Sequence, residues 1–270
     1  MLMVKQTVNI ICENPTTGRK LALSGNGDLS VCRDGQWERL GDDARFEGEL
    51  TPCAFQDILC ARGSFYVAGT TAGGQAALYS SLAGEIWSPV SLKEQHFWAD
   101  GKPPRGGAVK LFFEPCMSQI LLVCSGGDVV IIPECPKCIK ILRLTDRTVV
   151  DADYSDHRMT LTYGDGQRET VSIVTADAIR VSLSYAKQTG GKLIDIRPEK
   201  IRLQEGPIPC SAAIDPEDLD DYLKTKPRDA RLYFMCSFGT IADQAAWHAY
   251  YAGFQNARSL GGCHRGMHIK

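Results

Sequence analysis

The chain has 270 residues, which is enough for one or two domains with cores of ordinary size. Its 30 Lys and Arg nearly balance its 32 Asp and Glu, so the net charge indicates neither a nucleic-acid partner nor an anionic membrane surface. The first residues lack the sustained apolar run of a signal peptide, and the longest apolar runs have only the length of a strand. We therefore expect a cytoplasmic protein without a membrane partner.

The 11 cysteines are many for such a protein. Because the chain is neither short nor marked for secretion, a disulfide framework is not the expected reason for them. Cys32, Cys60 and Cys124 fall in apolar strand patterns, where cysteine usually packs as a small hydrophobic residue. We expect the same packing role for Cys210. The cysteines that remain as candidates for chemistry are Cys236, Cys263, Cys135 and Cys138.

Residues 1–172 have the pattern of an all-β domain. Short apolar strands alternate with turn sequences, and no stretch has the 3.6-residue period of an amphipathic helix. Glycine-rich tips indicate hairpins that recur at similar intervals along the chain. The four predicted hairpins are Lys20–Cys32, Ser64–Ser80, Gln119–Pro133 and Arg158–Ile173.

This recurrence of antiparallel strands is typical of β-propeller blades. The segment Ser80–Trp87 resembles the Asp-box turn of sialidase-type propellers, although Leu82 stands at the Asp position. An open meander or a β-sandwich fits the same pattern, and the sequence leaves these alternatives open. An incomplete propeller would expose sheet edges, and such edges favour pairing with a second subunit in a homodimer.

Residues 173–270 have a different pattern, in which predicted strands alternate with predicted helices. Thr175 is suited to cap a helix, and Asp215 and Pro216 have the pattern of a second helix start. Alternating strands and helices predict a parallel α/β sheet. The predicted elements include helices over 176–188, after Asp215 and over 241–252, and strands over 192–197, 231–235 and 257–260.

The order of these signals resembles the rhodanese family from Thr175 to His264. The pieces that carry the resemblance are Leu193–Glu199, Gly206–Pro209, Cys236–Gly239 between a strand and a helix, and Leu260–Gly262. The resemblance implies a catalytic Cys236 in an active-site loop made by Ser237, Phe238, Gly239, Thr240 and Ile241. It also implies supporting roles for Asp195 and Arg197, with no cofactor and no metal.

The residues of this loop agree with that chemistry. A loop that joins a strand to a helix in a parallel sheet lies at the carboxyl edge, where such folds bind ligands. Backbone N–H groups and the helix N-terminus favour a thiolate or a bound anion there by about 1 kcal/mol. The resemblance implies that Cys236 accepts a sulfane sulfur as a persulfide. We therefore expect sulfur transfer or thiol-redox chemistry, with a donor or acceptor that is a protein or a small thiol.

Departures from the family pattern leave the enzymatic status open. Ser237 and Ile241 stand where the family commonly has basic residues. Pro207 stands where the family's Gly-His-Ile-Pro turn has its histidine. The loop therefore lacks a fixed cation that would receive a small dianion. The alternative interpretation is a catalytically degenerate module that binds a protein partner, with the β domain as a further recognition surface.

The sequence allows more than one interpretation of Cys263 with His264, and of the pair Cys135 and Cys138. In the rhodanese topology the strand before Cys263 lies beside the strand before Cys236, and both end at the same edge of the sheet. Cys263 could therefore form a disulfide with Cys236, with His264 as a proton carrier. A tail without contacts is equally compatible. The Cys135/Cys138 pair supplies half of a zinc site, but no matching second pair follows. A reversible disulfide, a shared metal and an ordinary loop all remain open for this pair.

Overall fold

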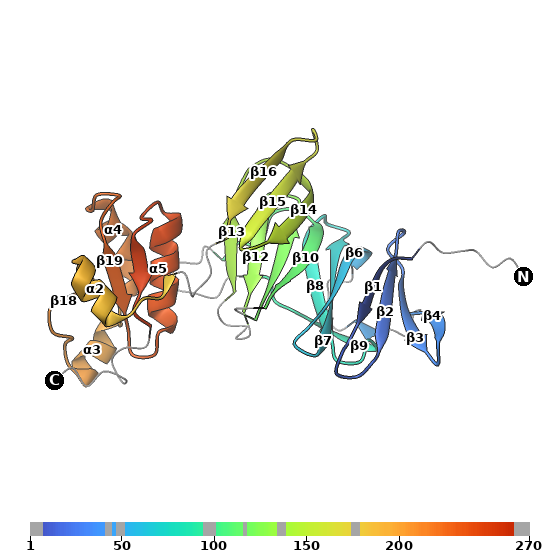
Figure 1. Ribbon diagram of the computed structural model, residues 1–270, viewed down its shortest axis with the longest axis horizontal. Helices are drawn as coiled ribbons and strands as arrows, with labels where there is room; N and C mark the ends of the chain where they lie inside the picture. Colours follow the sequence, from blue (N-terminus) through green and yellow to red (C-terminus); the bar gives the residue numbers. More distant parts are fainter. Residues whose placement is uncertain are drawn as a thin grey trace, which may run out of the picture. The chain divides into compact units, whose positions relative to one another are not determined.

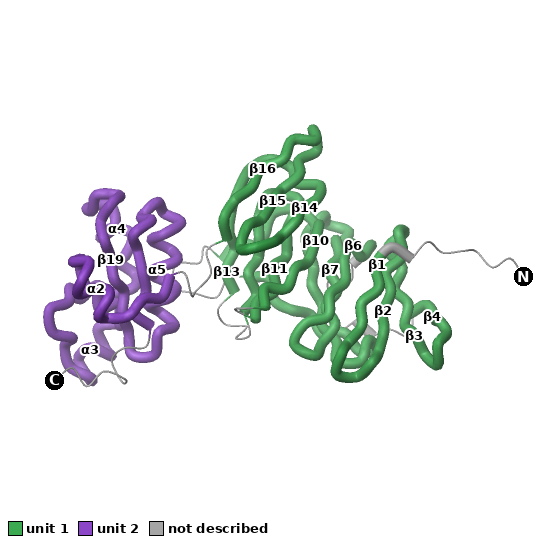
Figure 2. The backbone as a smooth tube through the Cα atoms, in the orientation of Figure 1, with its two compact units in different colours: residues 1–95, 101–173 green, residues 96–100, 174–270 purple. Residues whose placement is uncertain are grey.

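The computed structural model of the protein describes residues 8–40, 45–46, 52–93, 101–115, 118–133, 139–173 and 179–261 (Figure 1). The chain forms two compact units, which Figure 2 shows in different colours. Unit 1 comprises residues 1–95 and 101–173, and unit 2 comprises residues 96–100 and 174–270. Each unit has its own hydrogen-bonded sheets.

The described residues of unit 1 form strands and turns without a helix, as predicted. Four sheets follow one another in chain order, with strand orders β1-β2-β3-β4, β5-β9-β8-β7-β6, β10-β11-β12-β13 and β14-β15-β16. All pairings in them are antiparallel except β5 with β9. The strands are β1 (Val8–Glu13), β2 (Lys20–Ser24), β3 (Leu29–Arg33), β4 (Gln36–Arg39), β5 (Arg45–Phe46), β6 (Pro52–Ala61), β7 (Ser64–Thr71), β8 (Ala76–Ser81), β9 (Ile86–Pro89), β10 (Ala108–Glu114), β11 (Gln119–Cys124), β12 (Asp128–Ile132), β13 (Lys140–Arg143), β14 (Val149–Ser155), β15 (Arg158–Tyr163) and β16 (Arg168–Ser172).

The four predicted hairpins are confirmed as β2–β3, β7–β8, β11–β12 and β15–β16. Each belongs to a different sheet, so the repeat in the sequence corresponds to one sheet per repeat. The sheets succeed one another along unit 1 in Figure 1. This blade-like arrangement confirms the propeller-like interpretation of the N-terminal part.

The hydrophobic core of unit 1 lies between successive sheets. In β11, Ile120, Leu122 and Cys124 pack with residues of the second sheet. Leu121 and Val123 of the same strand pack with residues of the fourth sheet. The third sheet is therefore covered on both faces, which explains why β11 and β12 are apolar at almost every position.

The Asp-box-like segment Ser80–Trp87 spans the turn between β8 and β9. Gly84 adopts a φ of +84°, and its N–H donates to Ser81 Oγ at 2.8 Å. The indole of Trp87 is buried and donates to the Gly84 carbonyl oxygen at 3.2 Å. Leu82 is 73% exposed at the position where the pattern has Asp. The turn therefore forms without that carboxylate.

Unit 2 is built around a parallel sheet of strand order β18-β17-β19-β20. The alternation of strands and helices confirms the predicted α/β fold of this part. The helix α5 packs on β19 and β20. The elements are α2 (Leu183–Thr189), β17 (Lys192–Asp195), α3 (Glu199–Glu205), β18 (Ser211–Ala213), the 3-10 helix η2 (Pro216–Asp218), α4 (Leu219–Lys224), β19 (Leu232–Met235), α5 (Thr240–Tyr251) and β20 (Ala257–Ser259).

The predicted helix over 176–188 is wrong in its extent. The Val181 N–H donates to the Ser259 carbonyl oxygen at 2.9 Å, and this pairing with β20 interrupts a continuous helix. The helix α2 starts only after Ser182, whose Oγ accepts from the Tyr185 N–H at 3.1 Å. Thr175, the predicted cap, lies outside the described residues.

A helix begins after Asp215, as predicted, but the Asp215 side chain does not cap it. Its Oδ1 instead accepts from the Glu199 N–H at 2.8 Å, at the start of α3. The short helix α3 was not predicted, and its first N–H group receives this acceptor from a residue later in the chain.

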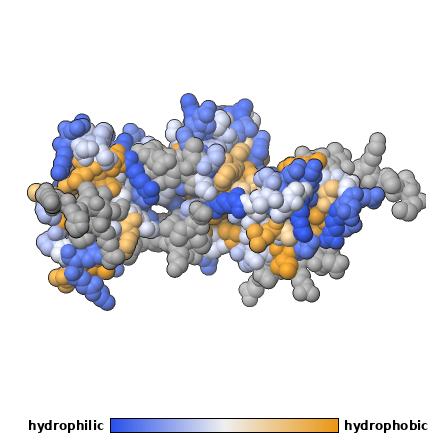
Figure 3. All heavy atoms as spheres, turned by 60° about the horizontal axis from the view of Figure 1, so that its bottom comes forward, coloured by the Kyte–Doolittle hydropathy of each residue, from blue (hydrophilic) through white to orange (hydrophobic). Residues whose placement is uncertain are grey.

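The described residues contain no helix long and apolar enough to cross a membrane. On the face drawn in Figure 3, hydrophobic residues form separate patches among hydrophilic ones. Among the residues that the structure describes, Leu203, Leu82 and Phe238 are the large apolar side chains with the highest exposure.

Candidate active site at Cys236

Cys236 lies where β19 ends and shortly before α5 begins, as predicted. The residue is 2% exposed. Gly239 turns the chain with a φ of +93°, a backbone conformation that side chains disfavour. This turn brings two backbone N–H groups to the sulfur. The Gly239 N–H donates to Cys236 Sγ at 3.1 Å, and the Ala242 N–H does so at 3.4 Å.

These donors define what the loop can do chemically. Both point at one sulfur atom, and one of them belongs to the first turn of α5. Because N–H groups at a helix N-terminus carry partial positive charge, they favour negative charge on the atom that they face. The loop is therefore suited to hold a thiolate or an anionic sulfur without a Lys or Arg side chain in it.

The other predicted loop residues have different surroundings. Ser237 is buried, and its Oγ donates to Glu205 Oε2 at 2.6 Å. Phe238 is 70% exposed, Thr240 is exposed, and Ile241 is half-buried. The loop thus presents an aromatic side chain to its surroundings and keeps its serine inward.

Asp195 and Arg197, the predicted supporting residues, form a buried ion pair. Arg197 Nε and Nη2 donate to the two carboxylate oxygens of Asp195 at 2.8 and 2.7 Å. Arg197 Nη1 contacts Glu205 Oε2 at 3.1 Å, and Nη2 also donates to the Gly206 carbonyl oxygen at 2.8 Å. The hydrogen bonds that Arg197 donates to Asp195, the charge of Asp195 and then the contact with Glu205 raise the pKa of Arg197 against the opposing effect of burial. This guanidinium is therefore a fixed structural cation.

Sequence reasoning missed Glu205. This residue ends α3 and receives hydrogen bonds from both Ser237 and Arg197 on the same Oε2. The Pro198-Glu199 pair, with proline before an acidic residue, was a usable signal for the start of α3. No local pattern would have placed the end of that helix beside the Cys236 loop.

The remaining cysteine predictions have mixed outcomes. Cys263, His264, Cys135 and Cys138 lie outside the described residues. The packing role expected for Cys210 is wrong, because this residue is exposed and sits in a turn with a φ of +61°. Cys124 is buried in the core of unit 1, as expected. The described residues hold no group of three or more His, Cys, Asp or Glu suited to bind a metal ion.

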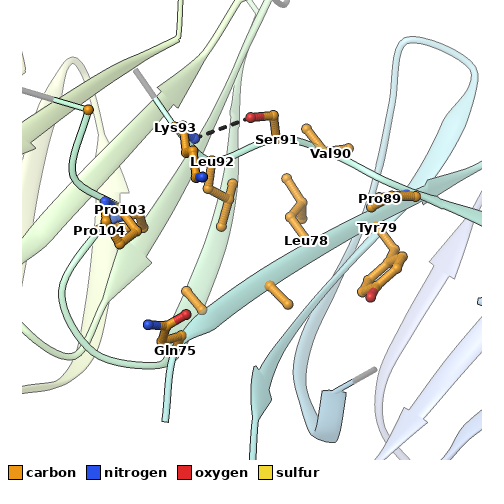
Figure 4. Close-up of a pocket in the computed structure, with 13 residues that line it drawn as sticks. Gln75, Leu78, Tyr79, Pro89, Val90, Ser91, Leu92, Lys93, Pro103 and Pro104 are labelled. Atoms are coloured by element: carbon orange, nitrogen blue, oxygen red, sulfur yellow. Dashed lines mark hydrogen bonds between the residues drawn. The ribbon is translucent and has the colours of Figure 1, made fainter. Parts of the chain in front are cut away.

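Unit 1 has an apolar pocket of about 600 Å³ (Figure 4). Leu78 and Tyr79 of β8 lie on one side of it, and Pro103 and Pro104 lie on another. Lys93 also lines the pocket, and its backbone N–H donates to Ser91 Oγ at 3.3 Å. The pocket is a separate recess in unit 1 and contains none of the residues of the Cys236 loop.

No protein-family model matches the chain, and no curated protein matches it. Among solved structures, one third of the chain (33%) superposes on 93% of the human single-domain sulfurtransferase TSTD1, with 25% identity and a TM-score of 0.30. A chain of the nidogen/laminin complex matches 60% of this chain over 58% of its own length, with 15% identity and a TM-score of 0.44. The extracellular domain of a hybrid two-component system from B. thetaiotaomicron matches 64% of this chain over 25% of its own, with 9% identity and a TM-score of 0.47.

Proposed function

We propose that unit 2 is a sulfur carrier in which Cys236 forms a persulfide. The observation that carries the proposal is the pair of N–H groups, from Gly239 and Ala242, that face Cys236 Sγ. They stabilise the thiolate that attacks a donor and the anionic sulfur that results. The likeness to a human single-domain sulfurtransferase is consistent with this chemistry.

The proposed reaction has two balanced steps. In the first, the Cys236 thiolate attacks the outer sulfur of a donor persulfide, R–S–SH, and the S–S bond of the donor breaks. The donor thiolate leaves with the bonding electron pair, and Cys236 carries the outer sulfur as Cys–S–SH. In the second step an acceptor nucleophile attacks that outer sulfur, and the Cys236 thiolate is the leaving group. No net oxidation occurs.

The surroundings of the loop favour a donor of low charge. The loop residues from Cys236 to Ile241 include no Lys or Arg. Arg197, which is linked to the loop through Glu205 and Ser237, is already bound to Asp195 and Glu205. A persulfide on a small thiol or on a cytoplasmic protein suits this site better than thiosulfate does, because thiosulfate would bring a dianion into a loop that offers it no charge-assisted hydrogen bond from Lys or Arg.

Unit 1 is proposed as the part that recognises the donor or acceptor. Its apolar pocket of about 600 Å³ has the size of a site for a small molecule or a peptide side chain. The edge strands β4 and β16 are mostly exposed, and we propose that such an edge pairs with a second copy in a homodimer. Sedimentation velocity of the full chain over a range of concentrations tests the dimer.

A single-turnover experiment tests sulfur transfer. The full chain is loaded with glutathione persulfide, desalted to remove the donor, and treated with dithiothreitol while sulfide release is measured. We expect close to one sulfide per wild-type protein and none from Cys236→Ser. Cys210→Ser is the matched control, because it removes an exposed thiol of the same unit. Equal release from wild type and Cys236→Ser would contradict the proposal.

The second candidate function is a partner-binding module without turnover. Two observations favour it, namely the 2% exposure of Cys236 and the 70% exposure of the neighbouring Phe238. An exposed aromatic side chain at a loop tip is typical of a contact residue in a protein interface. The single-turnover experiment separates the two, since a binding module would carry no releasable sulfur.

A further inference from the structure

We infer that Glu205 is a positioning residue for the Cys236 loop and that it acts through its hydrogen bond with Ser237. The link of this residue to sulfur transfer rests on the proposed function, whereas its effect on the Cys236 thiol does not. Glu205 lies at the end of α3, and Ser237 follows Cys236 directly. The contact between them joins two elements that are far apart in the sequence.

The anchor on the α3 side is rigid. Glu205 Oε2 accepts from Ser237 Oγ at 2.6 Å and contacts Arg197 Nη1 at 3.1 Å. Arg197 is 1% exposed and is held in turn by two hydrogen bonds to Asp195, which belongs to β17. The carboxylate of Glu205 is therefore fixed by a guanidinium that cannot move without breaking a buried ion pair.

The loop side of the contact controls the sulfur. Only Ser237, Phe238 and Gly239 separate Cys236 from the first residue of α5. Fixing the Ser237 side chain restricts the backbone on both sides of it, and this includes the turn at Gly239. That turn carries the N–H group that lies 3.1 Å from Cys236 Sγ. Loss of the Ser237–Glu205 contact should therefore loosen the donors around the sulfur.

The choice of variants follows from the atoms involved. Ser237→Ala removes the hydroxyl, and Ser237→Thr keeps one. Glu205→Ala removes both acceptor oxygens, whereas Glu205→Gln keeps one oxygen that can accept from Ser237 and Arg197. Glu199→Ala is the matched control, since Glu199 is an exposed carboxylate at the other end of α3.

The readout is the rate at which iodoacetamide alkylates Cys236 in the full chain, measured by mass spectrometry of its peptide at pH 7 and pH 10. Access to the thiol affects both rates alike, so their ratio isolates how well the loop stabilises the thiolate. We expect Ser237→Ala and Glu205→Ala to lower the pH 7 to pH 10 ratio by roughly fivefold, the effect of about one hydrogen bond. Ser237→Thr, Glu205→Gln and Glu199→Ala should stay near wild type.

A double variant makes the inference specific. If Ser237 and Glu205 act through one contact, Ser237→Ala/Glu205→Ala should lower the ratio no further than either single variant. A purely structural role would lower the thermal unfolding midpoint and leave the ratio unchanged, and this result would overturn the inference. Additive losses would also overturn it. Should Glu205→Ala not fold, the pair Ser237→Ala and Ser237→Thr still decides the outcome.

Failure of the two proposals can be told apart. Alkylation requires no sulfur donor, so the positioning role stands or falls on the rate ratio alone. If wild type releases no sulfide in the single-turnover experiment but the ratio changes as expected, the sulfur-carrier proposal fails and the positioning role remains.

Discussion

The N–H group of Gly239 lies 3.1 Å from the sulfur of Cys236, and the φ of +93° at Gly239 makes this approach possible. A residue with a Cβ would occupy that conformation only at a cost. The chemistry of the loop and the backbone conformation of one glycine are thus directly connected.

Gly239→Ala should weaken both the stability of the loop and its reaction. We expect a loss of about 1–2 kcal/mol in the free energy of unfolding and a slower formation of the Cys236 persulfide. Urea denaturation and the loading rate measure the two effects. Gly253→Ala is a matched control, because Gly253 has a φ of +99° at the far end of α5. If both variants load at the same reduced rate, the special role of Gly239 is wrong.

Arg197→Ala should destabilise unit 2 strongly. Arg197 and Asp195 are both 1% exposed, so the substitution leaves a buried carboxylate without its main partner. We expect a loss of about 3–5 kcal/mol, measured by urea denaturation of the full chain. Lys224→Ala breaks an ion pair on the surface, in which the side chains of Lys224 and Asp221 are 75% and 83% exposed. This exposed pair is screened by water, so the control should unfold close to wild type. A similar loss in both variants would refute the buried-pair account.

The cysteines of the two units should differ in alkylation at neutral pH. Burial, and then the neighbouring Cys60, raise the pKa of Cys12 to about 12, so its thiol stays protonated at pH 7. Cys210 is exposed in a turn. Peptide mapping after brief treatment with iodoacetamide should show Cys210 modified and Cys12 intact. Equal modification of half-buried Cys12 in the folded protein would contradict the raised pKa of its thiol.

Asp57 should make the stability of unit 1 dependent on pH. This β6 carboxylate is buried and accepts from the Leu111 and Ile58 N–H groups at 2.8 and 2.9 Å, and burial raises its pKa above the ordinary 3.8. The folded protein therefore holds this proton more tightly than the unfolded chain does. The resulting stability is fully present below the ordinary pKa and is lost as pH rises through the higher folded value.

The test compares the unfolding midpoint of wild type with that of Asp57→Asn between pH 4 and pH 7. The amide cannot titrate, so the difference in favour of wild type should grow as the pH falls toward 4. Changes in other carboxyl groups affect both proteins and cancel in the difference. A difference that is constant over this range would show that Asp57 titrates alike in the folded and unfolded states.

The hairpins of unit 1 and the setting of Cys236 could be predicted because their signals are local. Glycine-rich tips fix the positions of tight turns, and a cysteine between an apolar strand and a helix is necessarily in a loop. These local signals do not specify how the sheets stack, because the same alternation suits a sandwich or a meander. Burial of β11 on both faces, by residues of two other sheets, decides between them.

The contacts that complete the site depend on residues far apart in the chain. Ser237 and Glu205 meet only because α3 returns to the edge of the sheet, and no local pattern specifies that meeting. The interruption of the predicted helix before Ser182 has the same origin, since it depends on Ser259 of β20. Cys210 was wrongly expected to pack. It adopts a left-handed turn conformation that glycine usually marks, and a cysteine at this position gives no such signal.

The central claim is that Cys236 accepts a sulfane sulfur. Its most direct test is the intact mass of the full chain after incubation with glutathione persulfide, followed by sequencing of the peptide that contains Cys236. The account predicts a gain of about 32 Da that maps to Cys236 and is absent in Cys236→Ser. An unchanged mass in wild type, or a gain that maps to another cysteine and persists in Cys236→Ser, would contradict it.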